Sequence, residues 1–297
     1  MTPATDRSGI LLALAGYALL SVGDAVVKSM ADEWAPTAIA ALRYTLGAMG
    51  LSAILLAREG RSALAIPRPA LQLARGLCVG IATAAFFTAL AFMPLAEATT
   101  IVFVAPIVTA LLAPLLIGEV VRRGTLVASV VAFAGVIVVL RPNVLELGWP
   151  ALLPLASAFG MGLLVIANRA VAREGSALAM QAYIAVTGAV VLVVFALLAD
   201  ASGMATFTIE EPSASVVARC VVVAITASSA HWLVYLGTTR AGASAIAPMT
   251  YVQLLTATAL GWVFFGNRPD LATWAGAAII IGAGLYLWWS GKAPRRS

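Results

Sequence analysis

Residues 86–101 read FFTALAFMPLAEATTI, and residues 231–246 read HWLVYLGTTRAGASAI, so one local pattern occurs twice in this chain. Each stretch ends an apolar segment in aromatic and apolar residues, turns tightly, and restarts with Ala-(Thr/Ser)-(Thr/Ala)-Ile. The two stretches lie 145 residues apart, which is about half of the 297-residue chain. The pattern therefore predicts that the two halves of the chain adopt related folds.

A second match lies further along the chain, where Gly118-Glu119 corresponds to Gly266-Asn267 at an offset of 148 residues. In both places a glycine turn separates two apolar segments, and the following segment is again rich in small residues. One alternative is that any two membrane segments rich in alanine, leucine and glycine look alike. Two matches at similar offsets, in corresponding segments, favour a true internal duplication.

The composition predicts a membrane protein. Hydrophobic residues make up 62% of the chain and charged residues 10%, whereas soluble domains have about 45–50% and about 25%. Mean hydropathy is +1.01. A helix needs about 20 apolar residues to cross a bilayer. Ten segments meet this need, at residues 8–30, 36–57, 71–93, 97–117, 124–141, 149–171, 177–199, 213–237, 243–265 and 271–290.

These spans divide evenly between the two halves, with five in residues 1–146 and five in residues 147–297. Because five is odd, the second half must insert upside down relative to the first. Inverted repeats of this kind occur in many transporters, whose substrate site lies near the midplane between the repeats. We therefore expect an all-α membrane protein with ten transmembrane helices, arranged as two inverted five-helix repeats around a central cavity.

The distribution of charge predicts the orientation. Most of the 18 basic residues fall on the same side as the two termini, whereas the acidic residues collect on the other side, as at Asp32 and Glu33. The positive-inside rule then places both termini in the cytoplasm. The net charge of +5 is explained by a basic rim beside anionic lipid. No nucleic-acid partner is expected.

The five-plus-five arrangement, the turns at Gly118-Glu119 and Gly266-Asn267, and the segments at Pro106 and Pro248 resemble the drug/metabolite transporter superfamily, EamA type. The resemblance covers essentially the whole chain. The chain looks most similar to the aromatic amino acid exporters of the bacterial inner membrane, which also export methyl viologen. This resemblance implies a ten-helix basket and export of amino acids. The chain departs from strict repetition at Asn267, which stands where the first copy has Glu119, and this favours a structural turn there.

Three charged residues lie within spans on the acidic side: Asp24, Lys28 and Arg43. Intramembrane charges are costly, so they are functional candidates. Asp24 and Arg43 are each six or seven residues from a span end, at a depth of roughly 10 Å. An Asp24–Arg43 pair is expected, either as a cavity wall that holds a carboxylate or ammonium group or as a structural ion pair. For Lys28 we favour snorkelling toward Asp32 and Glu33.

His231 is the only histidine of the chain and lies at middle depth in the eighth span. Helical spacing places it on one face with Ser228 and Tyr235. It is a candidate for proton coupling or for stacking on a substrate, and the alternative is a neutral histidine hydrogen-bonded within the bundle. A serine hydrolase built on Ser228 and His231 is disfavoured because no Gly-x-Ser-x-Gly sequence surrounds the serine.

Aromatic residues in spans of both halves predict an apolar pocket for an indole, a phenol or a flat cation; packing or lipid contact is the alternative for each of them. Pro106 and Pro248 are expected to kink the fourth and ninth spans, and Gln253 follows the second kink. The candidate cavity residues are Tyr17, Asp24, Arg43, Phe86, Phe103, His231, Trp232, Tyr235, Tyr251 and Gln253.

The sequence favours a carrier over an enzyme. It lacks the G-x-x-x-x-G-K-[ST] loop that binds nucleotide phosphates and lacks a His/Cys cluster for a metal, so no cofactor or metal is expected. We expect alternating access with a small-molecule substrate, in contact with membrane lipid, as a monomer or alternatively a dimer. Carriage of a purine or a polar amino acid, lipid flipping, and an intramembrane enzyme remain alternatives.

Overall fold

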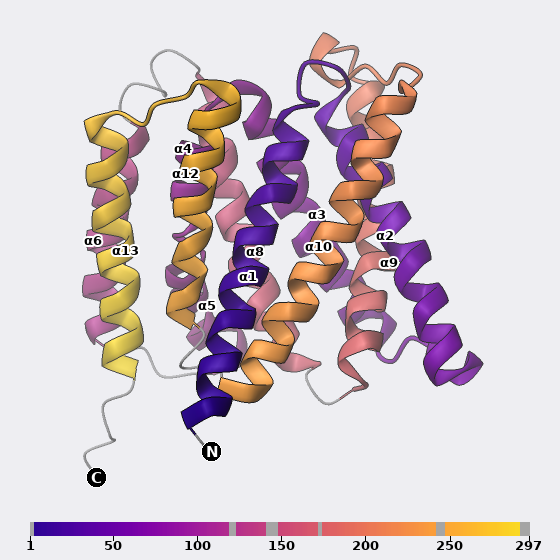
Figure 1. Cartoon of the computed structure of the whole chain (residues 1–297), viewed down its shortest axis with the longest axis horizontal. Helices are drawn as coiled ribbons and strands as arrows, with labels where there is room; N and C mark the ends of the chain where they lie inside the picture. Colours follow the sequence, from indigo (N-terminus) through magenta and orange to yellow (C-terminus); the bar gives the residue numbers. More distant parts are fainter. Residues whose placement is uncertain (1–2, 119–122, 141–147, 172–173, 242–246, 292–297) are drawn as a thin grey trace.

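The computed structural model of the chain describes residues 3–118, 123–140, 148–171, 174–241 and 247–291 (Figure 1). All regular structure in these ranges is helical. Within these ranges, seven helical stretches are long and apolar enough to cross a membrane, with α4 and α5 together forming one of them, and three shorter apolar helices accompany them. Together they coincide with the ten expected spans. The α-helices are α1 (Pro3–Lys28), α2 (Pro36–Glu59), α3 (Pro69–Phe92), α4 (Leu95–Val102), α5 (Ala105–Ile117), α6 (Arg123–Leu140), α8 (Leu153–Ala170), α9 (Ala177–Asp200), α10 (Ala214–Ala241), α12 (Val252–Phe265) and α13 (Leu271–Gly291).

The helices run between two ends of the molecule. α1 begins and α13 ends at the same end, which we call the terminal end (Figure 1). The opposite, distal end carries the connection between α1 and α2 and the connection between α9 and α10. Short 3₁₀ helices join the main elements: η1 (Arg61–Leu64), η2 (Trp149–Leu152), η3 (Ala205–Phe207) and η4 (Ala247–Tyr251).

Helices of the two halves of the chain interleave. α1 packs along α10, α2 along α9, α3 along α8, and α6 along α13. Small residues allow the close approach of α1 and α10: a Cβ on Gly237 would lie 2.6 Å from the Gly9 carbonyl, and one on Gly16 would lie 2.8 Å from the Ala230 carbonyl. Close backbone contact of this kind is what holds helices together where lipid removes the hydrophobic driving force.

The fourth span, expected as one helix over residues 97–117, is interrupted. α4 ends at Val102 and α5 begins at Ala105, with Phe103 and Val104 between them. The cause is Pro106, which has no N–H to donate to the Val102 carbonyl and so ends the regular bonding. The corresponding span of the second half is also irregular, because the 3₁₀ helix η4 precedes α12.

The glycine turns that follow these two spans are alike. Gly118 ends α5 with φ +71°, and Gly266 ends α12 with φ +66°, both in the left-handed region that favours glycine. The Asn267 N–H donates to the Gly261 carbonyl over 3.1 Å, which closes the end of α12. Glu119 and the expected repeat boundary at residues 146/147 lie outside the described residues.

The largest apolar cluster lies between α1, α2, α3, α9 and α10, and includes the fully buried Met30, Ile39 and Leu90. A second cluster joins α4, α6, α8, α12 and α13 around Ile101 and Ile280. Each cluster therefore draws side chains from both halves of the sequence, and the polar groups described next lie where the two halves meet.

Candidate functional site

Asp24 on α1 contacts the second half of the chain. The Gln253 side-chain amide donates to the Asp24 carboxylate over 3.3 Å. One turn away, the Ser21 hydroxyl donates to the Gln253 carbonyl over 2.7 Å. These bonds join α1 to the start of α12, so two of the candidate residues are brought together.

Arg43 on α2 does not form the expected ion pair with Asp24, and that prediction was wrong. The two side chains interact electrostatically, but the carboxylate uses Gln253 instead. Among the described residues the guanidinium has no hydrogen bond, and its Nε is buried without a partner. Its Cζ lies 4.4 Å from the centroid of the Tyr44 ring and 5.4 Å from that of Phe87.

Lys28 forms no ion pair with Asp32 or Glu33 at the distal surface, although it interacts electrostatically with Asp32. Its ammonium donates to the Leu90 and Met93 carbonyls, each over 2.9 Å, and lies 5.6 Å from the centroid of the Phe265 ring. These carbonyls belong to the end of α3, where the last helical acceptors lack intrahelical partners. Lys28 also lies one turn beyond Asp24 on the same face, so it covers the site toward the distal end.

His231 lies deep in the bundle and yet is exposed. It shares a face of α10 with Cys220 and Ala224, which are buried toward the core. It also interacts electrostatically with Arg43 on α2. His231 therefore lies on the side of α10 that is turned toward α2 and Arg43.

Trp232 and Tyr235 pack against one another with ring centroids 5.6 Å apart. Trp232 is 43% exposed and shares a face with Ile225, which is 60% exposed. Helical periodicity places this face away from α1. The structure does not bring Trp232 together with Asp24 or Gln253.

Phe103 and Tyr251 form an edge-to-face pair with ring centroids 5.5 Å apart. They lie at the irregular positions of the fourth and ninth spans, 148 residues apart, which matches the repeat offset. The Tyr251 ring also packs directly against Gly284 of α13. Tyr17 on α1 lies near this pair, because it hydrogen bonds to the side chain of Thr250, the residue before Tyr251. Phe86 is half-buried on α3 beside the largest core cluster.

Sequence reasoning missed a buried cation, Arg75 on α3, which is 4% exposed. Its Nε donates to the Asn168 side chain over 2.7 Å, and one Nη donates to the Met180 carbonyl over 3.4 Å. The other Nη donates to the Gln72 side chain. Gln72 lies three residues before Arg75 on the same helix, and this i, i+3 spacing was the one available signal. The sequence analysis placed Arg75 only among the basic residues on the side of the two termini.

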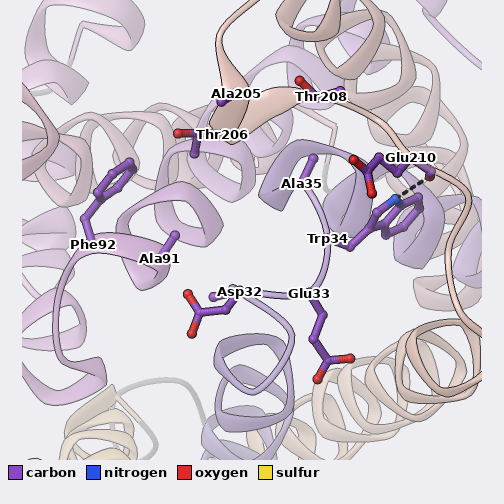
Figure 2. Close-up of a pocket in the computed structure, with 11 residues that line it drawn as sticks. Asp32, Glu33, Trp34, Ala35, Ala91, Phe92, Ala205, Thr206, Thr208 and Glu210 are labelled. Atoms are coloured by element: carbon purple, nitrogen blue, oxygen red, sulfur yellow. Dashed lines mark hydrogen bonds between the residues drawn. The ribbon is translucent and has the colours of Figure 1, made fainter.

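The distal end carries a separate pocket of about 360 Å³, apart from the polar contacts inside the bundle (Figure 2). Asp32, Trp34 and Phe92 line it, together with residues of the α9–α10 connection. The Trp34 indole N–H donates to the Glu210 carbonyl over 2.8 Å and thereby ties the α1–α2 connection to the α9–α10 connection. The pocket thus lies at the distal end between the α1–α2 connection, the end of α3 and the α9–α10 connection.

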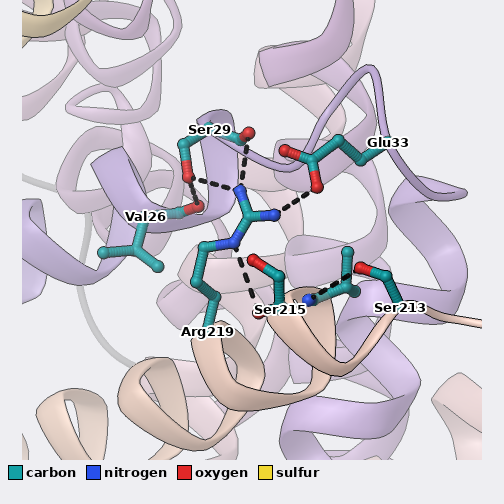
Figure 3. A network of polar contacts seen from close by, with 7 residues as sticks. Val26, Ser29, Glu33, Ser213, Ser215 and Arg219 are labelled. Carbon is teal, nitrogen blue, oxygen red and sulfur yellow. Dashed lines mark hydrogen bonds and ion pairs between the residues drawn. The ribbon is translucent and has the colours of Figure 1, made fainter.

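Beside this pocket, Arg219 of α10 ties the helix to the end of α1 (Figure 3). The guanidinium donates to the Ser29 carbonyl over 3.0 Å and forms an ion pair with Glu33. The hydrogen bond from Arg219 lowers the pKa of the Glu33 carboxyl below its ordinary value of 4.5. In the described ranges no group of three metal-ligating side chains could hold a metal ion.

These features define a class of protein: a polytopic helical membrane protein in which Ser21 and Asp24 of the first half bond to Gln253 of the second half. The family model of the EamA-like transporter family matches residues 7–141 and again residues 148–289, and the chain belongs to this family. It is therefore a membrane transporter of small metabolites, and it carries the family sequence twice.

Curated relatives differ in what their names say they carry. The S-adenosylmethionine uptake transporter of Rickettsia prowazekii is 26% identical over 99% of this chain and 96% of its own length. The riboflavin transporter of Rhizobium johnstonii is 28% identical over 78% of this chain and 74% of its own length. The pseudopaline exporter CntI of Pseudomonas aeruginosa is 26% identical over 93% of this chain and 94% of its own length. The specific likeness to aromatic amino acid exporters is not among these findings.

A solved crystal structure shares the fold. It covers 97% of this chain and 99% of its own chain, with a TM-score of 0.63 and 22% sequence identity. At 22% identity this likeness describes the arrangement of the helices and not the substrate. It supports the ten-helix architecture independently of the sequence matches.

Proposed function

We propose that this transporter exports a small metabolite with a flat ring, in first place an aromatic amino acid, by alternating access. In this proposal one inverted copy, residues 1–146, rocks against the other, residues 147–297, around a central cavity. The double family match at residues 7–141 and 148–289 supports the division into copies. The odd number of spans in each copy supports their opposite orientation.

The observation that carries the proposal is that the interrupted spans of both halves meet. Phe103 and Tyr251 touch at the two irregular positions, and Gln253, two residues later, contacts Asp24. Discontinuous helices mark substrate sites in transporters because they turn backbone polar groups and helix ends toward the cavity.

Recognition of a flat ring is supported by the aromatic side chains at this meeting point and by the relatives. S-adenosylmethionine and riboflavin, named for two relatives, each contain a flat heteroaromatic ring. The adenine of S-adenosylmethionine also favours the alternative of a purine carrier. Export is supported by the relative that exports pseudopaline, although other relatives are uptake transporters.

The proposed location is the bacterial inner membrane, with the terminal end in the cytoplasm. Arg58, Arg61 and Arg68 at the terminal end, against Asp32 and Glu33 at the distal end, support this orientation. Because one chain contains both copies, we propose that the monomer is the transport unit, with a dimer as the alternative.

The test is uptake of labelled phenylalanine, tryptophan and threonine into proteoliposomes, with and without an imposed pH gradient. Saturable uptake of the two aromatic amino acids, above protein-free liposomes and above threonine, is the expected result. Uptake that needs no gradient would indicate facilitated transport, and uptake that needs one would indicate proton coupling. Absence of uptake by folded protein under both conditions would overturn the aromatic amino acid proposal, and labelled adenine would then test the purine alternative.

A further inference from the structure

Arg43 is a cation within a membrane span that lacks an anionic partner. No hydrogen bond or ion pair engages its guanidinium among the described residues, and the buried Nε is unsatisfied. Buried polar groups are normally hydrogen-bonded, and an exception calls for an explanation. Intramembrane arginines normally pair with a carboxylate or with backbone carbonyls. The partner that the described part of the chain does not supply to this guanidinium is an anion.

The surroundings of Arg43 orient the guanidinium without neutralising it. The rings of Tyr44 and Phe87 lie 4.4 and 5.4 Å from Cζ. Tyr44 is itself held by the Thr83 hydroxyl, at 3.3 Å from the tyrosine oxygen. A ring offers a planar cation a face to stack on. The donors on the guanidinium edge stay available, and their fork geometry matches a carboxylate.

The complementary charge is Asp24. Its carboxylate interacts electrostatically with Arg43 but does not pair with it; its hydrogen-bond partner is the neutral amide of Gln253. Lys28, the nearest basic residue along α1, is committed to the carbonyls of Leu90 and Met93. The site thus keeps one cation and one anion apart, each without a partner of opposite charge.

We infer that Arg43 binds the carboxylate and Asp24 the ammonium group of a zwitterionic α-amino acid. This inference rests on the proposed transport function and narrows its substrate class, because it assigns recognition of the head group to α1 and α2. Other residues then bind the ring of the solute. Two fixed charges of opposite sign reject solutes that lack either group, since one buried charge would be left unpaired.

The test uses three ligands that differ only in the head group: phenylalanine, phenethylamine, which lacks the carboxylate, and 3-phenylpropionate, which lacks the ammonium group. Each competes with labelled phenylalanine for uptake into proteoliposomes that carry wild type, Arg43→Gln or Asp24→Asn. Wild type should prefer phenylalanine over both analogues by roughly tenfold to a hundredfold, the value of one charged hydrogen-bonded contact.

The two variants should lose opposite preferences. Arg43→Gln should weaken binding of phenylalanine and 3-phenylpropionate but strengthen binding of phenethylamine, which then leaves no buried cation unpaired. Asp24→Asn should weaken binding of phenylalanine and phenethylamine but strengthen binding of 3-phenylpropionate, which then leaves no buried anion unpaired. Arg268→Gln, which alters an exposed arginine at the distal end, is the matched control and should behave as wild type. An equal loss for all three ligands, or an unchanged preference, would overturn the inference.

A binding measurement separates this inference from the transport proposal and covers variants that reconstitute poorly. Thermal stabilisation of the purified protein by the same ligands reports binding without transport, and Arg43→Lys, which keeps the charge but loses the fork, should be stabilised by phenylalanine to an intermediate extent. Stabilisation by phenylalanine without uptake would contradict the transport proposal and support the head-group site. Transport of an uncharged solute, together with no stabilisation by phenylalanine, would contradict the head-group site and support the transport proposal.

Discussion

Arg75 and Arg43 are both arginines within membrane helices, but their surroundings differ in kind. Arg75 is 4% exposed, and its donors reach Asn168, Gln72 and the Met180 carbonyl. Arg43 stacks on two rings and donates to none of the described residues. A satisfied cation holds helices together, whereas an unsatisfied one is available to a solute. Partners, rather than depth, thus distinguish a structural charge from a functional one.

The largest expected effect is on the stability of Arg75→Gln. The substitution removes a cation that links α3 to α8 and α9, and it leaves the Asn168 oxygen and the Met180 carbonyl without their donor. Each hydrogen bond to a charged group that is lost in this way costs about 1.5–3 kcal/mol. The variant should show a markedly lower thermal midpoint, or little folded protein, by fluorescence-detected size exclusion.

The matched control for Arg75 is Arg68→Gln at the same end of α3. Arg68 pairs with Glu174 over 3.1 Å, but its side chain is 62% exposed. Exposed ion pairs contribute about 0–1 kcal/mol, so this variant should retain its midpoint. Equal losses in the two variants would contradict the distinction between a satisfied buried arginine and a surface one.

A smaller effect is expected for Lys28→Met. Loss of the ammonium group leaves the Leu90 and Met93 carbonyls at the end of α3 unbonded, at a cost of about 1–2 kcal/mol. The thermal midpoint should fall less than in Arg75→Gln. Lys28→Arg retains donors and should recover most of the loss. A midpoint for Lys28→Met equal to that of wild type would show that these bonds do not stabilise the contact between α1 and α3.

Arg43→Gln is expected to leave the stability of the protein unchanged or to raise it, whereas Arg75→Gln and Lys28→Met should lower it. The substitution breaks no hydrogen bond, and it removes a charge whose burial in a membrane is unfavourable. The ligand-free variant should therefore be as stable as wild type or more stable, while recognition of a carboxylate is lost. Thermal unfolding without ligand checks this prediction. A destabilisation as large as that of Arg75→Gln would mean that Arg43 is a structural residue.

The sequence predicted the spans well and the pairings poorly. That Asp24 and Arg43 lie on the halves of α1 and α2 nearer the distal end followed from counting residues from the span ends. Their pairing did not, because it depends on how α1 and α2 are rotated and on the competing amide of Gln253, which is distant in sequence. The interruption of the fourth span was signalled by Pro106, since proline removes a backbone donor wherever it stands.

Lys28 and Arg75 were misread for a common reason. Both lie near span ends, where long basic side chains usually reach water. Neither does so here, because the end of α3 offers free carbonyls to Lys28, and α8 and α9 offer acceptors to Arg75. Such acceptors come from helices far away in the sequence, so a reading of one segment at a time does not reveal them.

The smallest effect on stability is expected for Glu33→Gln. This substitution tests a third arginine, Arg219, which pairs with Glu33 at the surface. Because the hydrogen bond from Arg219 lowers the pKa of Glu33 below 4.5, the contact is fully present above the ordinary glutamate pKa and is lost as pH falls through the lowered value. Because the pair is exposed, wild type should exceed Glu33→Gln in thermal midpoint by only a small and constant margin from pH 7 down to about 5. This margin should vanish at more acidic pH, where wild type itself loses the charge. A large difference at pH 7 would place the Arg219 contact with the structural network of Arg75, and the rule that exposed pairs contribute little would then fail in this molecule.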